Sequence, residues 1–225
     1  MIKKGKKLIL MACSLFLIFI LYTLLVKFID VKAIGPNDSK VGFASLNQIV
    51  HRWFPLNLTL YNVTDWGSIF PIGVALLFAI LGLVQLIKRK KIRKVDGNIL
   101  ALGICYLSTF IVYVFFEFVV VNRRPVLLDG ILEASYPSST TMLSLVILVT
   151  CIDQVNIYIQ SKVLNYSCKM MCIGYALFLV IGRIISGVHW ASDIIGAMIV
   201  SAALIISYFC LQNILTTNGK PKEQN

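Results

Sequence analysis

The sequence predicts an all-α integral membrane protein: a bundle of six transmembrane helices with an interfacial helix after the first span. Three observations predict this fold. Hydrophobic residues make up 58% of the 225 residues and charged residues only 14%, whereas a soluble domain carries about a quarter. The apolar residues are gathered into six uncharged runs. The basic residues cluster between these runs, on one side of the predicted bundle.

The six uncharged runs have the lengths that a bilayer requires. A membrane-spanning helix needs about 20 mostly apolar residues. Five runs satisfy this, and the fifth in order is short unless it extends through Arg183 or begins near Val163. The runs cover residues 8–26, 67–87, 97–116, 134–152, 170–182 and 194–218. We therefore expect one membrane domain, residues 1–225, and we interpret the first run as an uncleaved span because it is too long for a signal peptide.

The segment between the first two spans, residues 28–66, begins with a turn-forming cluster at 35–39. Apolar residues then recur at helical spacing, namely Leu46, Ile49, Val50, Trp53 and Phe54. This spacing predicts an amphipathic helix lying in the membrane interface.

The distribution of the basic residues predicts the topology. Fourteen of the 21 Lys and Arg residues precede the first span, follow the second, lie between the fourth and fifth, or occur in the tail. With six spans, all four groups fall on one side, which is the cytoplasmic side by the positive-inside rule. We expect a multi-pass protein of the cell membrane with both termini in the cytoplasm and a disordered tail at 216–225. The charge is thus explained without nucleic-acid binding.

Three polar clusters lie at span ends, and the topology predicts that all three share the outer face. They occupy residues 122–125, 136–141 and 183–193. Ionisable groups next to membrane spans cost free energy to bury, and they mark a functional site.

The second cluster has the features of an anion site. Pro137 suits the first turn of a helix, and the free N–H groups of Ser139, Thr140 and Thr141 would then point outward from a positive helix end. The hydroxyl groups of Ser138 and Ser139 add hydrogen-bond donors.

The other two clusters supply cations and a nucleophile. Arg124 and Arg183 can bind phosphate oxygens in bidentate fashion. His189 and Asp193 are four residues apart, so we expect them on one helix face. Asp193 would then orient one ring nitrogen of His189 and leave the other free to attack.

These three clusters resemble the motifs of the membrane type 2 phosphatidic acid phosphatases, which share a core with vanadium haloperoxidases. The resemblance covers about residues 67–211. The first family motif matches at Arg124-Pro125, the second at Pro137-Ser138 and the third at Arg183, His189 and Asp193. The sequence departs from the motifs at four positions: Glu117 replaces a lysine, Ser139 a glycine, Thr140 a histidine and Gly182 a serine.

The resemblance implies hydrolysis of a lipid phosphate or diphosphate at the outer membrane face, through a phosphohistidine at His189. Asp193 would orient the nucleophile, and Arg124 and Arg183 would bind the phosphate. The substrate would be a lipid of the bilayer, and neither a cofactor nor a metal is expected. Nothing in the sequence specifies an oligomeric state.

The loss of the second-motif histidine affects the predicted reaction. That residue would protonate the leaving group, and losing a general acid costs about 10² to 10⁴ in rate. A phosphate leaving from a diphosphate, such as a polyprenyl diphosphate, needs the proton least. Glu117 is the first candidate for a substitute acid and Glu133 the second.

Two other interpretations stay open at this point. A lipid-phosphate binding or transport protein could keep the pocket without turnover. A haloperoxidase is the weaker alternative, because those enzymes bind vanadate with several cations and one is missing at Glu117.

Overall fold

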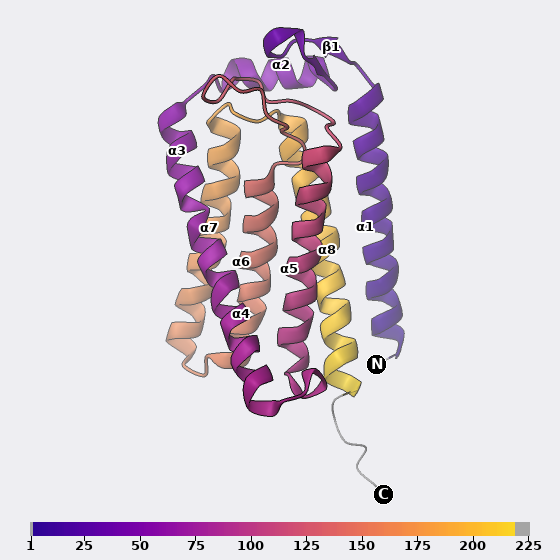
Figure 1. Ribbon diagram of the computed structural model, residues 1–225, viewed down its shortest axis with the longest axis vertical. Coiled ribbons are helices and arrows are strands. Elements are labelled where there is room, and N and C mark those ends of the chain that lie inside the picture. Colours follow the sequence, from indigo (N-terminus) through magenta and orange to yellow (C-terminus); the bar gives the residue numbers. More distant parts are fainter. Residues whose placement is uncertain (1, 219–225) are drawn as a thin grey trace, which may run out of the picture.

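The computed structural model describes residues 2–218 as a bundle of roughly parallel and antiparallel helices (Figure 1). Six helical segments are long and apolar enough to cross a membrane, so the predicted six-span bundle is confirmed. The helices are α1 (Ile2–Phe28), α2 (Ala44–Trp53), α3 (Leu58–Gly67), α4 (Ile69–Arg89), α5 (Gly97–Phe118), α6 (Ser139–Tyr158), α7 (Lys162–Ile185) and α8 (Ala191–Asn218).

Several spans are longer than their uncharged runs, or shifted from them. α3 and α4 together form the second span, which begins nine residues before the expected start. α7 extends the short fifth run at both ends. The fourth run was expected to begin at residue 134, but α6 begins at Ser139 because the uncharged residues before it form an extended loop. α8 reaches Asn218, so 216–218 are helical and the rest of the tail prediction lies outside the described residues.

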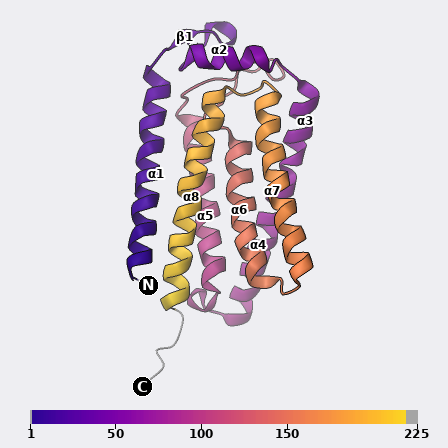
Figure 2. The same ribbon diagram turned by 180° about the vertical axis from the view of Figure 1, so that it is seen from behind.

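The predicted interfacial helix is present as α2, which lies across one end of the bundle (Figures 1 and 2). It follows a small hairpin of β1 (Lys32–Ala33) and β2 (Lys40–Val41). Its apolar residues Leu46, Ile49 and Trp53 are exposed, whereas polar Asn47 is buried. α2 thus turns apolar side chains outward, as a helix in the membrane interface does.

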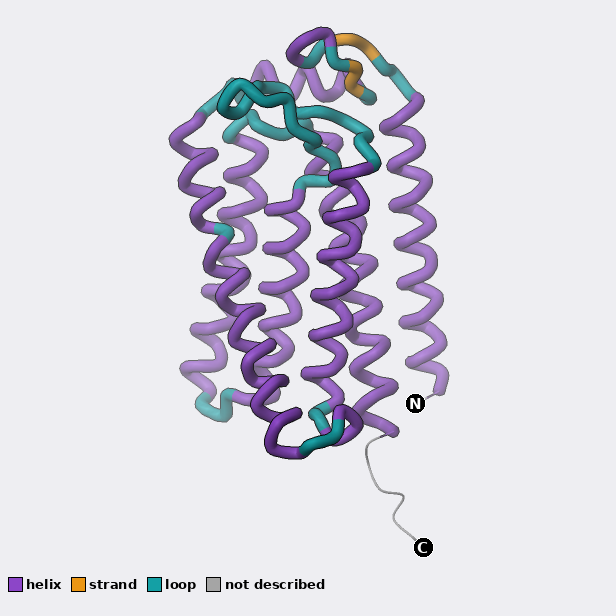
Figure 3. Tube along the Cα trace, in the orientation of Figure 1, coloured by secondary structure: helices purple, strands orange, loops and turns teal. Residues whose placement is uncertain are grey.

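The loops at the α2 end of the bundle carry all three polar clusters (Figure 3). The clusters lie where α5 ends, where α6 begins, and between α7 and α8. The expectation that they share one end is therefore correct. The start of α1, the link between α4 and α5, and the end of α8 lie at the opposite end (Figure 1).

α6 and α8 are the inner helices of the bundle. α8 contacts α1, α5 and α6 along its length. The fully buried side chains Leu102, Met142, Val146 and Val200 form part of one core shared by α5, α6 and α8. The polar residues that begin α6 and α8 are therefore held on the most enclosed part of the protein.

Tyr136 anchors the loop that leads into α6. Its ring stacks on Phe19 and packs edge-on against Phe116, and its hydroxyl group lies 2.7 Å from that of Thr23. Gly196 of α8 lies directly below the ring, because a Cβ added there would come 2.5 Å from the ring. The close approach of α8 requires a glycine at this position.

We expect Gly196→Ala to lower the free energy of unfolding by about 1–3 kcal/mol, because the new methyl group overlaps a ring that is held on three sides. Thermal unfolding of the purified protein in detergent measures the effect. Gly103→Ala is the matched control, since a Cβ at that position in α5 meets nothing within 4 Å. Equal unfolding temperatures for the two variants would contradict the packing described above.

Candidate active site

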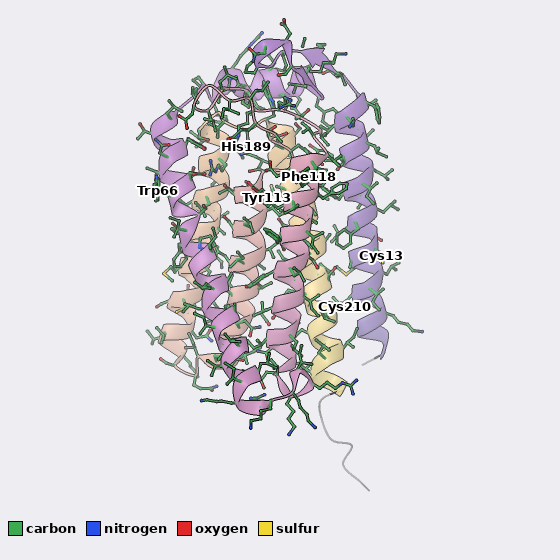
Figure 4. The ribbon with its side chains drawn as sticks, in the orientation of Figure 1. Cys13, Trp66, Tyr113, Phe118, His189 and Cys210 are labelled. Atoms are coloured by element: carbon green, nitrogen blue, oxygen red, sulfur yellow. The ribbon has the colours of Figure 1, made fainter. Side chains whose placement is uncertain are left out.

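His189 lies in the loop between α7 and α8, at the end of the bundle that α2 covers (Figure 4). The expectation that it shares a helix face with Asp193 is wrong, because α8 begins only at Ala191. Gly187 turns the loop with φ of 67°. A Cβ at Gly187 would come 2.7 Å from the carbonyl oxygen of Phe54, so both the conformation and the close approach favour glycine.

The two ring nitrogens of His189 have different neighbours. Nε2 lies 3.2 Å from Nη1 of Arg124, and Nδ1 lies 3.7 Å from Oδ2 of Asp193. Arginine has no acceptor, so Nε2 must accept this hydrogen bond with its lone pair. The proton then resides on Nδ1, which faces the carboxylate at a distance slightly beyond a hydrogen bond. Nε2 is therefore the ring nitrogen without a proton, and its electron pair accepts the hydrogen bond from Arg124.

Burial keeps the imidazole of His189 neutral. Only 7% of the residue is exposed. This burial, with the nearby charge of Arg124, lowers the pKa of His189 to about 4. Burial disfavours the charged form, and a neighbouring cation repels it. At neutral pH the ring is therefore an unprotonated base or nucleophile.

Asp193 is fixed by the chain around it. Its carboxylate accepts the N–H of Trp190 at 3.0 Å and the side-chain amide of Asn122 at 3.2 Å. Its carbonyl oxygen accepts the N–H of Ser138 at 3.2 Å. Asp193 thus caps the start of α8 and joins it to the other two clusters.

The α6 end differs in detail from the expected anion site. Pro137 lies before the N-cap residue Ser138, not in the first turn. The Ser138 hydroxyl donates to that of Thr141 at 3.0 Å, and the Thr140 hydroxyl accepts from Arg183 at 2.8 Å. Ser138 and Thr140 are thus buried with engaged hydroxyl groups, while Ser139 lines a cavity.

Arg183 is buried within the bundle. Its Nη2 donates to Oδ1 of Asp65 and to Thr140, and its guanidinium lies 5.0 Å from the ring centre of Tyr61. Nε and Nη1 have no partner, which leaves two buried donors available for an anion. The expected serine before this arginine is absent for a packing reason: a Cβ at Gly182 would come 2.5 Å from the Thr64 side chain.

A cavity of about 390 Å³ opens beside His189. Among the expected site residues, it brings together His189, Arg124, Ser139, Glu117 and Glu133. Ser138, Thr140, Arg183 and Asp193 are not among the residues that line it. Its lining consists of Tyr113, Phe116, Glu117, Val120, Arg123, Arg124, Glu133, Ala134, Ser135, Tyr136, Pro137, Ser139 and His189.

Glu133 forms an ion pair with Arg124, a cationic residue that lines the cavity. Its carboxylate accepts from Nε of Arg124 at 2.9 Å, while 45% of its side chain is exposed. Glu117 also lines the cavity, from the end of α5. Within residues 2–218, no three His, Cys, Asp or Glu side chains gather in a way that could hold a metal ion.

The sequence did not indicate two further residues that contact the site, namely Asp65 and Asn47, and it gave Asn122 only as a member of the first polar cluster. Asp65 pairs with Arg183 across 118 positions of sequence. Asn47 bonds to Ser192 across 145 positions. The only available sign was that Asp65 is a carboxylate close to an apolar run, where it needs a cationic partner.

Comparisons with known proteins concern the family and the fold. The PAP2 superfamily matches residues 108–216, a stretch that contains all three motifs, so the predicted family resemblance is confirmed there. The fold is similar to that in the crystal structure of the first transmembrane PAP2 type phosphatidylglycerolphosphate phosphatase from Bacillus subtilis, with a TM-score of 0.56, 18% identity, and coverage of 95% of this chain and 98% of that one. A search of curated proteins found no significant match.

We expect His189 to titrate near pH 4 in the folded protein, well below the ordinary histidine value of about 6.5. Histidine-labelled protein contains only two such rings, and His51→Gln assigns them in an NMR titration. Arg124→Gln should raise the pKa of His189, because it removes the repulsive cation while burial remains. A His189 pKa of 6.5 or above in the unaltered protein would contradict the buried, neutral ring.

Proposed function

We propose that this chain is a membrane phosphatase that hydrolyses a lipid phosphate or diphosphate through a phosphohistidine intermediate. One observation carries the proposal: His189, whose ring is neutral, lines a cavity, and its unprotonated Nε2 lies 3.2 Å from the Arg124 guanidinium. A nucleophile beside a cation suits attack on an anionic phosphate. The family match over residues 108–216 supports the same chemistry.

The proposed reaction has two displacement steps. Nε2 of His189 attacks phosphorus, the N–P bond forms, and the bond to the leaving oxygen breaks with its electron pair. Water then attacks the phosphohistidine, which releases inorganic phosphate and restores the ring. The charge that develops on the ring is stabilised by Asp193, which faces Nδ1 at 3.7 Å. Arg124 binds the phosphoryl oxygens once Glu133 has moved away.

The leaving group determines how well this site works. Thr140 stands where the family has a proton-donating histidine, and its hydroxyl group accepts a hydrogen bond from Arg183. It therefore holds the arginine and supplies no acid near neutral pH. A diphosphate, which expels a stable phosphate, suits such a site best. Glu117 is the proposed substitute acid, because its side chain lines the cavity that holds His189.

A groove beside the cavity supports a lipid substrate. It lies between α1 and α5, has a volume of about 640 Å³, and is lined almost wholly by apolar side chains. Phe116 belongs to the walls of both the groove and the cavity. A lipid with its phosphate beside His189 could extend its hydrocarbon chain along this groove.

We further propose that the site faces the outside of the cell and that both termini are cytoplasmic. The basic link between α4 and α5 lies at the end of the bundle opposite to His189 (Figures 1 and 4). The positive-inside rule places that end in the cytoplasm.

Binding or transport of lipid phosphates without turnover is the second candidate function. Two observations favour it: Glu133 already pairs with Arg124, and Thr140 replaces the usual acid. Such a protein would keep the phosphate pocket while losing the rate that the acid supplies.

The first experiment measures phosphate release by the purified protein from polyprenyl diphosphate and from phosphatidate. We expect the diphosphate to be cleaved faster, by about 10-fold or more, because its leaving group needs less protonation. His189→Ala should abolish release from both lipids. Activity of His189→Ala equal to that of the unaltered protein would exclude covalent catalysis, and equal or preferred cleavage of phosphatidate would exclude the leaving-group argument.

The second experiment tests the groove between α1 and α5 with a bulky substitution. Ile111→Trp should lower kcat/KM for a long-chain lipid diphosphate by about 10-fold, or about 1.4 kcal/mol, while hydrolysis of a small soluble aryl phosphate stays the same. Ile111 is exposed on α5 and lines the groove.

Ile104→Trp is its matched control, because Ile104 is exposed on the same helix but lines a separate groove toward α4. Equal effects of the two tryptophans on the lipid substrate would show that the groove between α1 and α5 holds no chain.

A further inference from the structure

Residues 42–65, called here the 42–65 segment, lie alongside the stretch of chain that contains the third motif, residues 183–193. Contacts occur in reverse order along the two stretches of chain. From the α7 side to the α8 side, the contacts join Thr64 to Gly182, Asp65 to Arg183, Asn57 to Ser186, Phe54 and Pro55 to Gly187, His51 to Trp190, and Asn47 to Ser192. The segment thus touches the motif at intervals from its arginine to the start of α8.

The Asp65 contact controls the direction of the Arg183 guanidinium. Only 1% of the Arg183 side chain is exposed, whereas 53% of the Asp65 side chain is. Nη2 is held by Asp65 and Thr140. Because the guanidinium is planar and rigid, fixing Nη2 also fixes Nε and Nη1. Those are the two buried donors without a partner.

The Asn47 contact controls the first turn of α8. Oδ1 of Asn47 accepts the N–H of Ser192 at 3.0 Å, and Nδ2 donates to the Ser192 hydroxyl at 2.9 Å. Both residues are fully buried. The next residue is Asp193, which also accepts from Asn122. The amide of Asn122 in turn accepts the N–H of Gly42 at 3.0 Å, so both ends of the 42–65 segment reach the site.

We infer that the 42–65 segment is a positioning element for the phosphate site, with Asp65 as the positioning residue for Arg183 and Asn47 as the positioning residue for the start of α8. The inference rests on the proposed function. Neither residue lines the cavity, so each acts through a residue of the third motif. The segment between the first two spans thereby has a role in anion binding in addition to its contact with the membrane interface.

The test measures the binding of orthovanadate, a phosphate mimic, to the full-length protein in detergent by calorimetry. Asp65→Asn should raise the Kd for orthovanadate by about 10-fold, because a charge-assisted hydrogen bond that orients Arg183 is lost. Asp65→Glu, which keeps the charge, should restore part of the affinity. Asp38→Asn is the control, because Asp38 is an exposed carboxylate in the turn Pro36–Asp38 and, within the part of the chain that the structure describes, its side chain bonds neither to the 42–65 segment nor to the third motif.

A double variant separates positioning from a general structural effect. In an Arg183→Gln background, Asp65→Asn should cause no further loss of orthovanadate binding. Equal affinities for Asp65→Asn and Asp38→Asn would overturn the inference, as would a full further loss in the Arg183→Gln background. A folded, unaltered protein that binds no orthovanadate would instead overturn the proposed function, and with it the phosphate site that the segment is inferred to position.

Discussion

The buried carboxylate of Asp193 is the constraint on which the rest of the site depends. A fully buried negative charge is costly unless hydrogen bonds satisfy it, and here the donors come from separate parts of the chain. The N–H of Trp190 belongs to the loop before α8, and the amide of Asn122 belongs to the loop after α5. Satisfying one charge therefore brings together loops that are distant in sequence, and His189 lies on the first of them.

The apolar core supports this polar arrangement from below. Tyr136 packs between α1, α5 and α8, with its ring against Phe19 and Phe116, and the next residues lead into α6. The position of Ser138 against Asp193 is thus set by aromatic packing as well as by a backbone hydrogen bond. Core and site are coupled because the same short loop belongs to both.

The sequence alone predicted the bundle well, because long uncharged runs have few alternatives to membrane helices. It also predicted that Arg124 and His189 would meet, since both stand at span ends on one side. The prediction was wrong where a spacing along the sequence was used to infer a position in space. The four-residue spacing of His189 and Asp193 suggested a helix, but the turn at Gly187 and the α8 cap place them otherwise. Asp65 was missed because its partner is distant in sequence, and no local pattern reveals such a pair.

The pairing of Glu133 with Arg124 has a consequence for how any ligand enters. Arg124 is already paired, so an anion that binds its Nε must displace the Glu133 carboxylate. Glu133 is half exposed, so its release into water costs little. The exchange therefore favours a ligand that carries more than one negative charge on neighbouring oxygens over a single carboxylate or a halide. Under the proposed function, Glu133 would thus act as an internal competitor of small singly charged anions for Arg124.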